Sequence, residues 1–296
     1  MRPTAGETTT VRTGSASEIR TVITLSSDFG SPYPAAMKGV LCSRTDARLV
    51  DVAHDLPRQD VGAAAFWLRE VLPYFPPAVH LAVIDPGVGT DRAALVVRAG
   101  DHALVGPDNG VLVPVARALA AEDGGSGGND ADTEDEEITS GASEPEPAVF
   151  TWEVDDPASR TFHGRDVFAP AAGAVHEAGV EDVETLDRVT PTTEHVDLTF
   201  PEPAVDEDEA TGEVLVVDGF GNVVTNLPRD LLNGRYGEQV ELNGESIPAT
   251  RTYAAVEPGE RVVTVGSHGN VELATNQGRG NEAFGLAVGD RVRLTR

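Results

Sequence analysis

The sequence predicts an α/β fold followed by a small β-barrel. From residue 21, short apolar runs rich in β-branched residues alternate with segments of helical periodicity, which is typical of α/β layers. Beyond residue 205, short β-like runs separated by turn signals dominate, and helical patterns are scarce. Hydrophobic residues make up 40% of the 296-residue chain and apolar segments recur throughout it, so we expect most of the chain to fold.

The elements of the first half follow from periodicity and from Pro and Gly positions. The run at 61–75 has helical periodicity and stops before Pro76 and Pro77, and Pro114 falls in the first turn of the next helix. This alternation predicts a largely parallel sheet with flanking helices. Strands are expected at 21–27, 47–53, 78–85, 93–100, 102–107 and 148–154, and helices at 35–44, 61–75 and 110–122.

Three boundaries divide the chain. Residues 1–20 contain no apolar core of a secretory signal, so we expect a disordered N-terminal extension. The α/β domain is expected at 21–200, and a disordered insertion at 121–147 interrupts it. This insertion holds 10 acidic and no basic residues and is rich in Gly and Ser. It therefore has too little apolar surface to offset the entropy lost on ordering. The β-barrel domain is expected at 205–296.

The charge balance excludes several classes of partner. The chain has 49 acidic and 22 basic residues, a formal charge of −27, which argues against nucleic acid and anionic lipid as partners. No stretch is long and apolar enough to span a bilayer. Lys38 is the only lysine. The acidity is typical of a disordered chain or of a halophilic protein, and the recurring apolar segments favour the halophilic interpretation.

The single cysteine, Cys42, excludes an internal disulfide and a multi-thiolate metal site. Because Cys42 ends the apolar run 37–42, we expect it to be a small buried hydrophobe. The absence of a signal segment predicts a cytoplasmic protein.

Four polar clusters follow predicted strands of the first domain, where ligands of open α/β sheets collect. Asp28 leads from a strand into a Gly turn, and acids in this position bind ribose hydroxyls or cap turns. Asp85 ends another strand, and Arg92 can fold back to pair with it. The 106–110 segment, GPDNG, is a turn or a cap. His163 is a candidate general base or water-orienting group at a helix start.

The fifth cluster belongs to the second domain. A Gly-Phe-Gly turn presents Asp218, Asn222 and Asn226, which we expect on one face. Ser267 and Glu272 lie within similar reach, and Tyr253 offers an aromatic stacking face. We interpret the remaining histidines as packing or surface residues: His54, His80, His102, His176 and His195. No Cys or His spacing indicates a metal.

Seven motifs, in order, resemble one family. These are SSDFG, MKG, DPGVGTxR, PDNG, FHGRDxFAP, DxFGNxxTN and SxGxxELA, between residues 21 and 295. Together they resemble the S-adenosyl-L-methionine (SAM) hydroxide adenosyltransferases, which are SAM hydrolases related to the fluorinase and chlorinase enzymes. The sequence departs from the family at His268, where Tyr or Arg is more usual, and in a shortened segment after Asp28.

The resemblance implies a function, an assembly and a set of site residues. It implies hydrolysis of SAM to adenosine and L-methionine, with SAM as substrate and no cofactor or metal. It implies a homotrimer whose sites lie between the first domain of one subunit and the second domain of its neighbour. The implied catalytic residues are Asp85, Arg92 and His163. The implied substrate-binding residues are Asp28, Asp218, Asn222, Tyr253, Ser267, Glu272 and Thr275.

Two alternatives remain open. A halogenase of the same fold forms 5′-halo-5′-deoxyadenosine and needs a dry halide pocket, which the charges of Asp85 and His163 disfavour. A non-catalytic sensor that binds SAM or adenosine is disfavoured because every catalytic position is filled.

Overall fold

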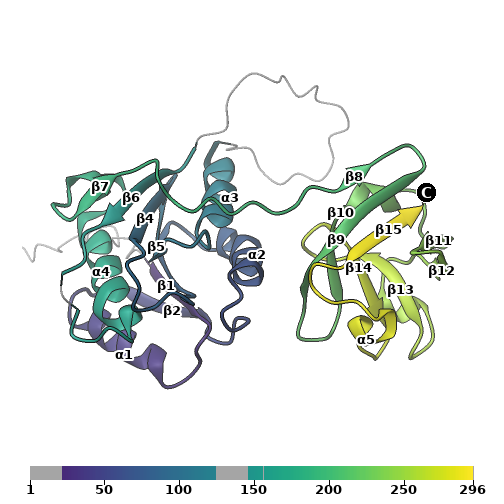
Figure 1. The fold of residues 1–296 in the computed structure, drawn as a ribbon, viewed down its shortest axis with the longest axis horizontal. Coiled ribbons are helices and arrows are strands. Elements are labelled where there is room, and N and C mark those ends of the chain that lie inside the picture. Colours follow the sequence, from purple (N-terminus) through teal and green to yellow (C-terminus); the bar gives the residue numbers. More distant parts are fainter. Residues whose placement is uncertain (1–21, 125–145, 156, 296) are drawn as a thin grey trace, which may run out of the picture.

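The computed structural model describes residues 22–124, 146–155 and 157–295. The predicted extension at 1–20 lies outside the described residues, as does nearly all of the predicted insertion at 121–147. The described chain forms two sheets, one in the N-terminal part with helices packed on it and one in the C-terminal part (Figure 1).

The N-terminal sheet is mixed, with strand order β2-β1-β3-β5-β4-β6-β7. Its strands are β1 (Val22–Ser27), β2 (Arg48–Ala53), β3 (Ala78–Val83), β4 (Ala94–Ala99), β5 (His102–Pro107), β6 (Ala148–Trp152) and β7 (Val189–Pro191). The strands β2, β1, β3 and β5 are parallel, as predicted, whereas β4, β6 and β7 are added antiparallel. Only Gly100 and Asp101 join β4 to β5, a connection that is too short for a parallel crossover. The prediction of a largely parallel sheet was therefore wrong for the half that contains β4, β6 and β7.

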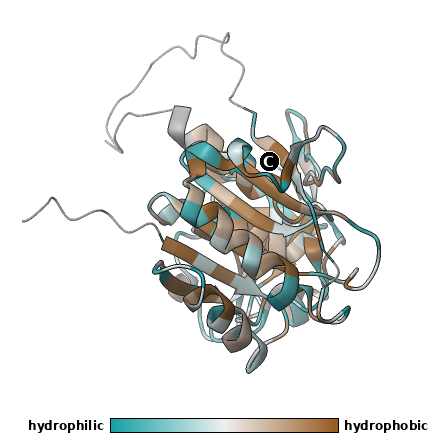
Figure 2. Ribbon diagram, turned by 90° about the vertical axis from the view of Figure 1, so that its left-hand side faces the viewer, coloured by the Kyte–Doolittle hydropathy of each residue, from teal (hydrophilic) through white to brown (hydrophobic). Residues whose placement is uncertain are grey.

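Helices cover both faces of this sheet, and Figure 2 shows its hydrophobic strands in brown. On one face α1 and α4 bury Met37, Leu41 and Ala172 against the strands, and on the other α2 and α3 bury Leu68 and Val115. The helices are α1 (Tyr33–Cys42), α2 (Val61–Val71), α3 (Val113–Gly124) and α4 (Ala169–Ala178). Among the described residues, no helix combines the length and the apolar character needed to cross a bilayer.

The prediction that Cys42 is buried was wrong, since its side chain is exposed. The buried positions of α1 are Pro34, Met37 and Leu41, which recur every three or four residues. Cys42 follows Leu41 by one residue, a turn of about 100° around the helix axis, and therefore leaves the buried face.

The C-terminal sheet is antiparallel and nearly closed into a barrel. Its strands are β8 (Ala204–Val205), β9 (Glu209–Val217), β10 (Val223–Pro228), β11 (Gln239–Leu242), β12 (Glu245–Pro248), β13 (Arg261–Val265), β14 (Asn270–Thr275) and β15 (Arg291–Thr295), with α5 (Gly280–Phe284) beside β14. The order runs from β12 to β13, with β8 paired to β9. A bridge between Ala249 and Val263 joins the two ends of this order.

The two parts meet through α2 and β9. Phe66 of α2 packs with Leu215, Val216 and Val224 of the barrel in one small apolar cluster. The segment 192–203 connects the parts in an extended path (Figure 1). Arg117 of α3 pairs with Asp197 of this segment, with contacts of 2.9 and 3.0 Å. The connection is therefore fixed to the surface of the N-terminal part.

One buried polar chain lies within the N-terminal sheet. Thr24 Oγ1 lies 2.8 Å from His80 Nδ1, and His80 Nε2 lies 2.9 Å from His102 Nδ1. Burial, together with the smaller effect of the nearby His102, lowers the pKa of His80 to about 3, so the ring is neutral at ordinary pH. The prediction that these two histidines are packing residues is confirmed.

Candidate active site

The N-terminal cavity lies at the carboxyl ends of β1 and β3 and has a volume of about 510 Å³. Three predicted residues line it, namely Asp28 after β1, Asp85 after β3, and His163. Adjacent parallel strands end at the same edge of a sheet, so a ligand at this edge meets both carboxylates. Phe29, Tyr33 and Phe162 form one wall in edge-to-face contacts of 5.6 to 6.2 Å between ring centres.

Asp85 and Arg92 form a bidentate ion pair, as the sequence predicts. Arg92 Nε donates to Asp85 Oδ1 at 2.6 Å, and its Nη2 donates to Oδ2. The Asp85 side chain is 6% exposed and that of Arg92 is 11% exposed, so the pair is screened little by solvent. Arg92 also donates to the carbonyl of Ala93 at 3.0 Å and lies 5.0 Å above the Phe168 ring. The guanidinium is therefore held in one orientation.

The loop between Asp85 and Arg92 requires glycine at Gly89. Gly89 has a φ of +84°, and a Cβ there would lie 2.9 Å from the carbonyl oxygen of Arg160. Turns from Asp85 to Val88 and from Gly87 to Thr90 bend the chain, so that Arg92 returns to the strand end. The Gly and Pro content of this loop thus serves the ion pair.

His163 lies beside this ion pair, with its Nδ1 3.4 Å from Arg92 Nη2. Because arginine only donates, this contact favours the tautomer in which Nδ1 accepts and Nε2 carries the proton. Burial lowers the pKa of His163, and repulsion from Arg92 lowers it further, against the opposing pull of Asp85 and Asp166. A neutral ring with an Nε2–H donor can hold a water molecule by its oxygen.

A π-helical turn, Gly164–Phe168, follows His163 directly and leads into α4. A Cβ at Gly164 would lie 2.9 Å from Met37 Sδ, so only glycine allows this turn to pack so closely on α1. Pro170 lies in the first turn of α4, where a missing N–H costs nothing. Such turns inside helices are frequent at functional sites.

Asp28 is half-buried at the edge of the same cavity. Its Oδ2 accepts the backbone N–H of Gln59 at 2.7 Å, and no described residue engages Oδ1. One carboxylate oxygen is therefore available to a ligand in the cavity.

The 106–110 segment forms a turn that supports β3. Asn109 Nδ2 donates to the carbonyl of Ile84 at 2.8 Å, next to Asp85, and its Oδ1 accepts from the N–H of Val111. Asp108 accepts the N–H of Val196 in the connecting segment. Both are structural contacts and not a cap of α3, which begins at Val113.

The second cavity belongs to the C-terminal part and has a volume of about 970 Å³. All six predicted residues of that part line it: Asp218, Asn222, Tyr253, Ser267, Glu272 and Thr275. Asp218 Oδ1 accepts the N–H groups of Phe220 and Asn222, and its Oδ2 accepts the Asn222 amide at 3.0 Å. The turn thereby fixes both side chains at the mouth of the cavity.

Glu272 accepts two neutral donors deep in this cavity. Tyr253 donates its hydroxyl to Oε1 at 2.6 Å, and His268 Nε2 lies 3.3 Å from Oε2. His268 Nδ1 accepts the N–H of Asn270, so Nε2 carries the proton. Burial, followed by the bond to Glu272, raises the pKa of Tyr253. The cavity thus contains the carboxylates of Asp218 and Glu272, which favour a cationic ligand.

The expectation that Asn226 shares a face with Asp218 and Asn222 was wrong. Its side chain accepts the N–H of Glu213 and donates to the carbonyl of Pro201, both at 2.8 Å, outside the cavity. The pairing of β10 with β14 is irregular between Val224 and Pro228, so the alternation of faces along the strand does not extend to Asn226.

Sequence reasoning missed several residues of these cavities. Trp67 of α2 and Phe220, whose side chain is 81% exposed, line the C-terminal cavity. The arrangement of α2 against the barrel, which the sequence does not encode locally, brings Trp67 there. Phe220 carried a usable signal, because a large apolar residue at a turn tip has no core to enter.

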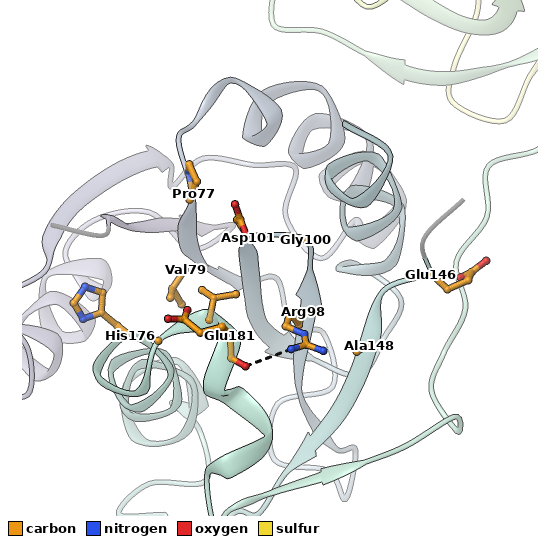
Figure 3. A pocket seen from close by; sticks show the side chains of 11 residues that line it. Pro77, Val79, Arg98, Gly100, Asp101, Glu146, Ala148, His176 and Glu181 are labelled. Atoms are coloured by element: carbon orange, nitrogen blue, oxygen red, sulfur yellow. Dashed lines mark hydrogen bonds between the residues drawn. The ribbon is translucent and has the colours of Figure 1, made fainter. Parts of the chain in front are cut away.

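A further cavity of about 590 Å³ lies at the opposite ends of the strands, before β3 and at the turn from β4 to β5 (Figure 3). None of the predicted site residues lines it. Its Arg98 is paired with Glu184 at 2.8 Å and contacts the carbonyl of Glu181. Among the described residues, no cluster of three or more His, Cys, Asp or Glu side chains could hold a metal ion.

No described residue lines both of the two cavities that hold the predicted residues. Asp28, Asp85 and His163 belong to one, and the remaining substrate-binding residues belong to the other. Arg92 lines an adjoining hollow on the other side of His163. Within one chain, the predicted residues therefore form two separate half-sites.

The electrostatics of His163 lead to a testable expectation. Its pKa in the folded protein should lie below the ordinary value of about 6.5, and Arg92→Gln should raise it, because Asp85 then attracts the imidazolium without competition. NMR titration of labelled histidine, assigned with His163→Gln, measures both values. Arg98→Gln removes an arginine that pairs with Glu184 at the opposite ends of the strands and should change little. A wild-type value at or above 6.5, or no change in Arg92→Gln, would contradict this account.

Both parts of the chain resemble known proteins. The chain matches the SAM hydroxide adenosyltransferase N-terminal domain over residues 23–186 and the C-terminal domain over 212–293. It is 40% identical to an (R)-S-adenosyl-L-methionine hydrolase of Salinispora tropica, covering 92% of this chain and 97% of that one. A fluorinase of Actinopolyspora mzabensis is 27% identical, covering 94% and 98%.

The fold is also found in a solved structure. The crystal structure of an uncharacterized conserved protein from Thermotoga maritima matches with a TM-score of 0.73 and 28% identity, covering 93% of this chain and all of that one. The two family matches together span well over half of the sequence, in the order and position of the two sheets. The chain therefore belongs to the SAM hydroxide adenosyltransferase family.

Proposed function

We propose that this chain hydrolyses SAM to adenosine and L-methionine by in-line attack of a water molecule on C5′ of the ribose. The observation that carries the proposal is the buried Asp85–Arg92 pair with neutral His163 beside it, at the edge of a cavity that also holds Asp28. The 40% identity to a SAM hydrolase over most of both chains supports the same reaction.

The reaction needs an oriented nucleophile more than an acid. The water oxygen forms a bond to C5′ as the C5′–S bond breaks. The electron pair of the C5′–S bond stays on sulfur and converts the sulfonium to the neutral thioether of methionine. Asp85 accepts the proton that the water loses, and His163 holds the water oxygen through Nε2–H. Arg92 pairs with the Asp85 carboxylate and fixes it in place. The leaving group is already cationic, so we propose that no cofactor or metal takes part.

The two half-sites divide the substrate. Asp28 accepts hydrogen bonds from the ribose diol through its available Oδ1. The C-terminal cavity holds the rest of SAM, with the carboxylates of Asp218 and Glu272 facing its positive charges. Asn222, Tyr253, Ser267 and Thr275 complete the polar lining.

We also propose that the complete site forms between copies of the chain. The cavities share no lining residue, and one SAM molecule has to meet both sets. A head-to-tail contact, in which the N-terminal cavity of one copy faces the C-terminal cavity of the next, closes into a ring. We propose three copies, a homotrimer, as the resemblance implies.

The cellular setting follows from charge and thiol chemistry. We propose a cytoplasmic protein, because an exposed free thiol such as Cys42 persists in a reducing compartment. We propose adaptation to high salt from the net charge of −27, because concentrated salt screens repulsion between carboxylates.

The direct test incubates the purified protein with SAM, with chloride and fluoride added separately. Wild-type protein should release adenosine and L-methionine in equal amounts, and Asp85→Asn, Arg92→Gln and His163→Gln should each lower kcat by about 100-fold or more. Asp91→Asn makes the same change as Asp85→Asn at an exposed position of the same loop and should leave the rate unchanged. A 5′-halo product would indicate a halogenase, and binding without turnover would indicate a sensor. Either result contradicts the proposal.

The halophilic proposal has its own measurement. Thermal unfolding followed by circular dichroism should show a midpoint that rises between about 0.2 M and about 3 M KCl, because the Debye length shortens to about 3 Å at 1 M. A midpoint that is independent of salt would show that the acidity serves another purpose.

A further inference from the structure

Four side chains form a hydrogen-bonded chain directly behind Asp28. Ser27 Oγ lies 2.7 Å from His54 Nδ1, His54 Nε2 lies 2.9 Å from Asp51 Oδ1, and Lys38 Nζ donates to Asp51 Oδ2 at 2.8 Å. These residues come from the end of β1, the segment after β2, β2 itself and α1. The sequence assigned His54 to packing or surface, which does not describe this arrangement.

The hydrogen bonds among these four side chains run in a defined direction. A carboxylate only accepts, so His54 Nε2 carries the proton that it donates to Asp51. In the neutral ring Nδ1 then accepts the hydroxyl proton of Ser27. The bond from Lys38, followed by the one from His54, lowers the pKa of Asp51. The Lys38–Asp51 ion pair thereby fixes the orientation of the His54 imidazole, as a carboxylate hydrogen-bonded to a histidine does at many sites.

The arrangement of Ser27, His54 and Asp51 differs from a hydrolytic Ser-His-Asp triad in two respects. The Ser27 side chain is fully buried, so no substrate can reach its oxygen. The ring is also reversed relative to that template, with serine at Nδ1 and the carboxylate at Nε2. A role in holding the protein chain fits better than a role as nucleophile.

His54 contacts the Asp28 loop on both sides of Asp28. The His54 ring is hydrogen-bonded to the hydroxyl of Ser27, the residue before Asp28. The His54 carbonyl accepts the N–H of Gly30, two residues after Asp28, at 2.7 Å. Gly30 has a φ of +62°, which allows the chain to turn there. The remaining support is the N–H of Gln59, which binds Asp28 Oδ2. The carboxylate orientation therefore depends on the placement of His54.

We propose that His54 is a positioning residue that aims the Asp28 carboxylate at the ribose hydroxyls, with Asp51 and Lys38 fixing the His54 ring. The inference rests on the proposed function through the assignment of Asp28 to the ribose. It adds three residues to the site that do not touch the substrate, and it ties the only lysine of the chain to substrate binding.

The test measures adenosine and 2′,3′-dideoxyadenosine binding by calorimetry. His54→Leu should weaken adenosine binding about tenfold and leave dideoxyadenosine binding unchanged, because only adenosine offers the diol to Asp28. His54→Asn keeps an acceptor for Ser27 and should recover part of the loss. His176→Leu alters a half-buried histidine that also bonds a threonine, Thr45, and should affect neither ligand.

Asp28→Ala separates this inference from the proposed function. If Asp28→Ala does not selectively weaken adenosine, the ribose assignment itself fails. If Asp28→Ala is selective while His54→Leu weakens both ligands equally or neither of them, the positioning role is wrong and the ribose assignment stands. Circular dichroism of each variant establishes that it is folded, and Asp51→Asn, which keeps the shape but removes the charge, provides a second variant if His54→Leu does not fold.

Discussion

The buried ion pair between Asp85 and Arg92 is the interaction on which the candidate site depends. Its two contacts fix the loop after β3, and the position of the guanidinium over Phe168 connects that loop to the π-helical turn that carries His163. The same guanidinium favours one His163 tautomer and helps to lower its pKa. A buried pair of this kind contributes uncertain net stability but fixes geometry, because removal of either partner leaves an unpaired buried charge.

Under the proposed function, charge complementarity lets the two half-sites share one substrate. SAM carries a sulfonium and an ammonium, and the two cavities present carboxylates from Asp28, Asp85, Asp218 and Glu272. Arg92 pairs with Asp85, whereas Glu272 is contacted by the Tyr253 hydroxyl and the His268 ring. An arginine therefore matches the carboxylate at the reacting end, and among the described residues no arginine or lysine pairs with Glu272 at the binding end. This division suits a water nucleophile at one end and a cation at the other.

The sequence was informative where function follows from position along a strand. Asp28 and Asp85 end buried strands of a parallel sheet, so their meeting at one edge could be expected before the structure was known. The antiparallel half of the sheet was missed because the α/β pattern predicts parallel strands, whereas the two-residue Gly100–Asp101 turn allows only an antiparallel pair. Asn226 was misplaced because the irregular pairing of β10 with β14 after Val224 cannot be seen in a two-residue alternation.

Contacts between distant elements were beyond sequence reasoning. His54 has no motif around it, and its role arises only when Ser27, Asp51 and Lys38 converge from separate elements. Trp67 likewise reaches the C-terminal cavity only through the packing of α2 on β9. Tertiary convergence of this kind is the main limit on site prediction from one sequence.

The central claim is that each complete site takes its catalytic half from one copy of the chain and its binding half from the next. Coexpression of Asp85→Asn and Glu272→Gln chains under different affinity tags, followed by purification of mixed assemblies, tests it directly. In any mixed ring of three copies, one of the three sites combines two intact halves, so purified mixed assemblies should regain about a third of wild-type SAM hydrolysis. Mixed assemblies as inactive as either parent would place the whole site within one chain and contradict the account.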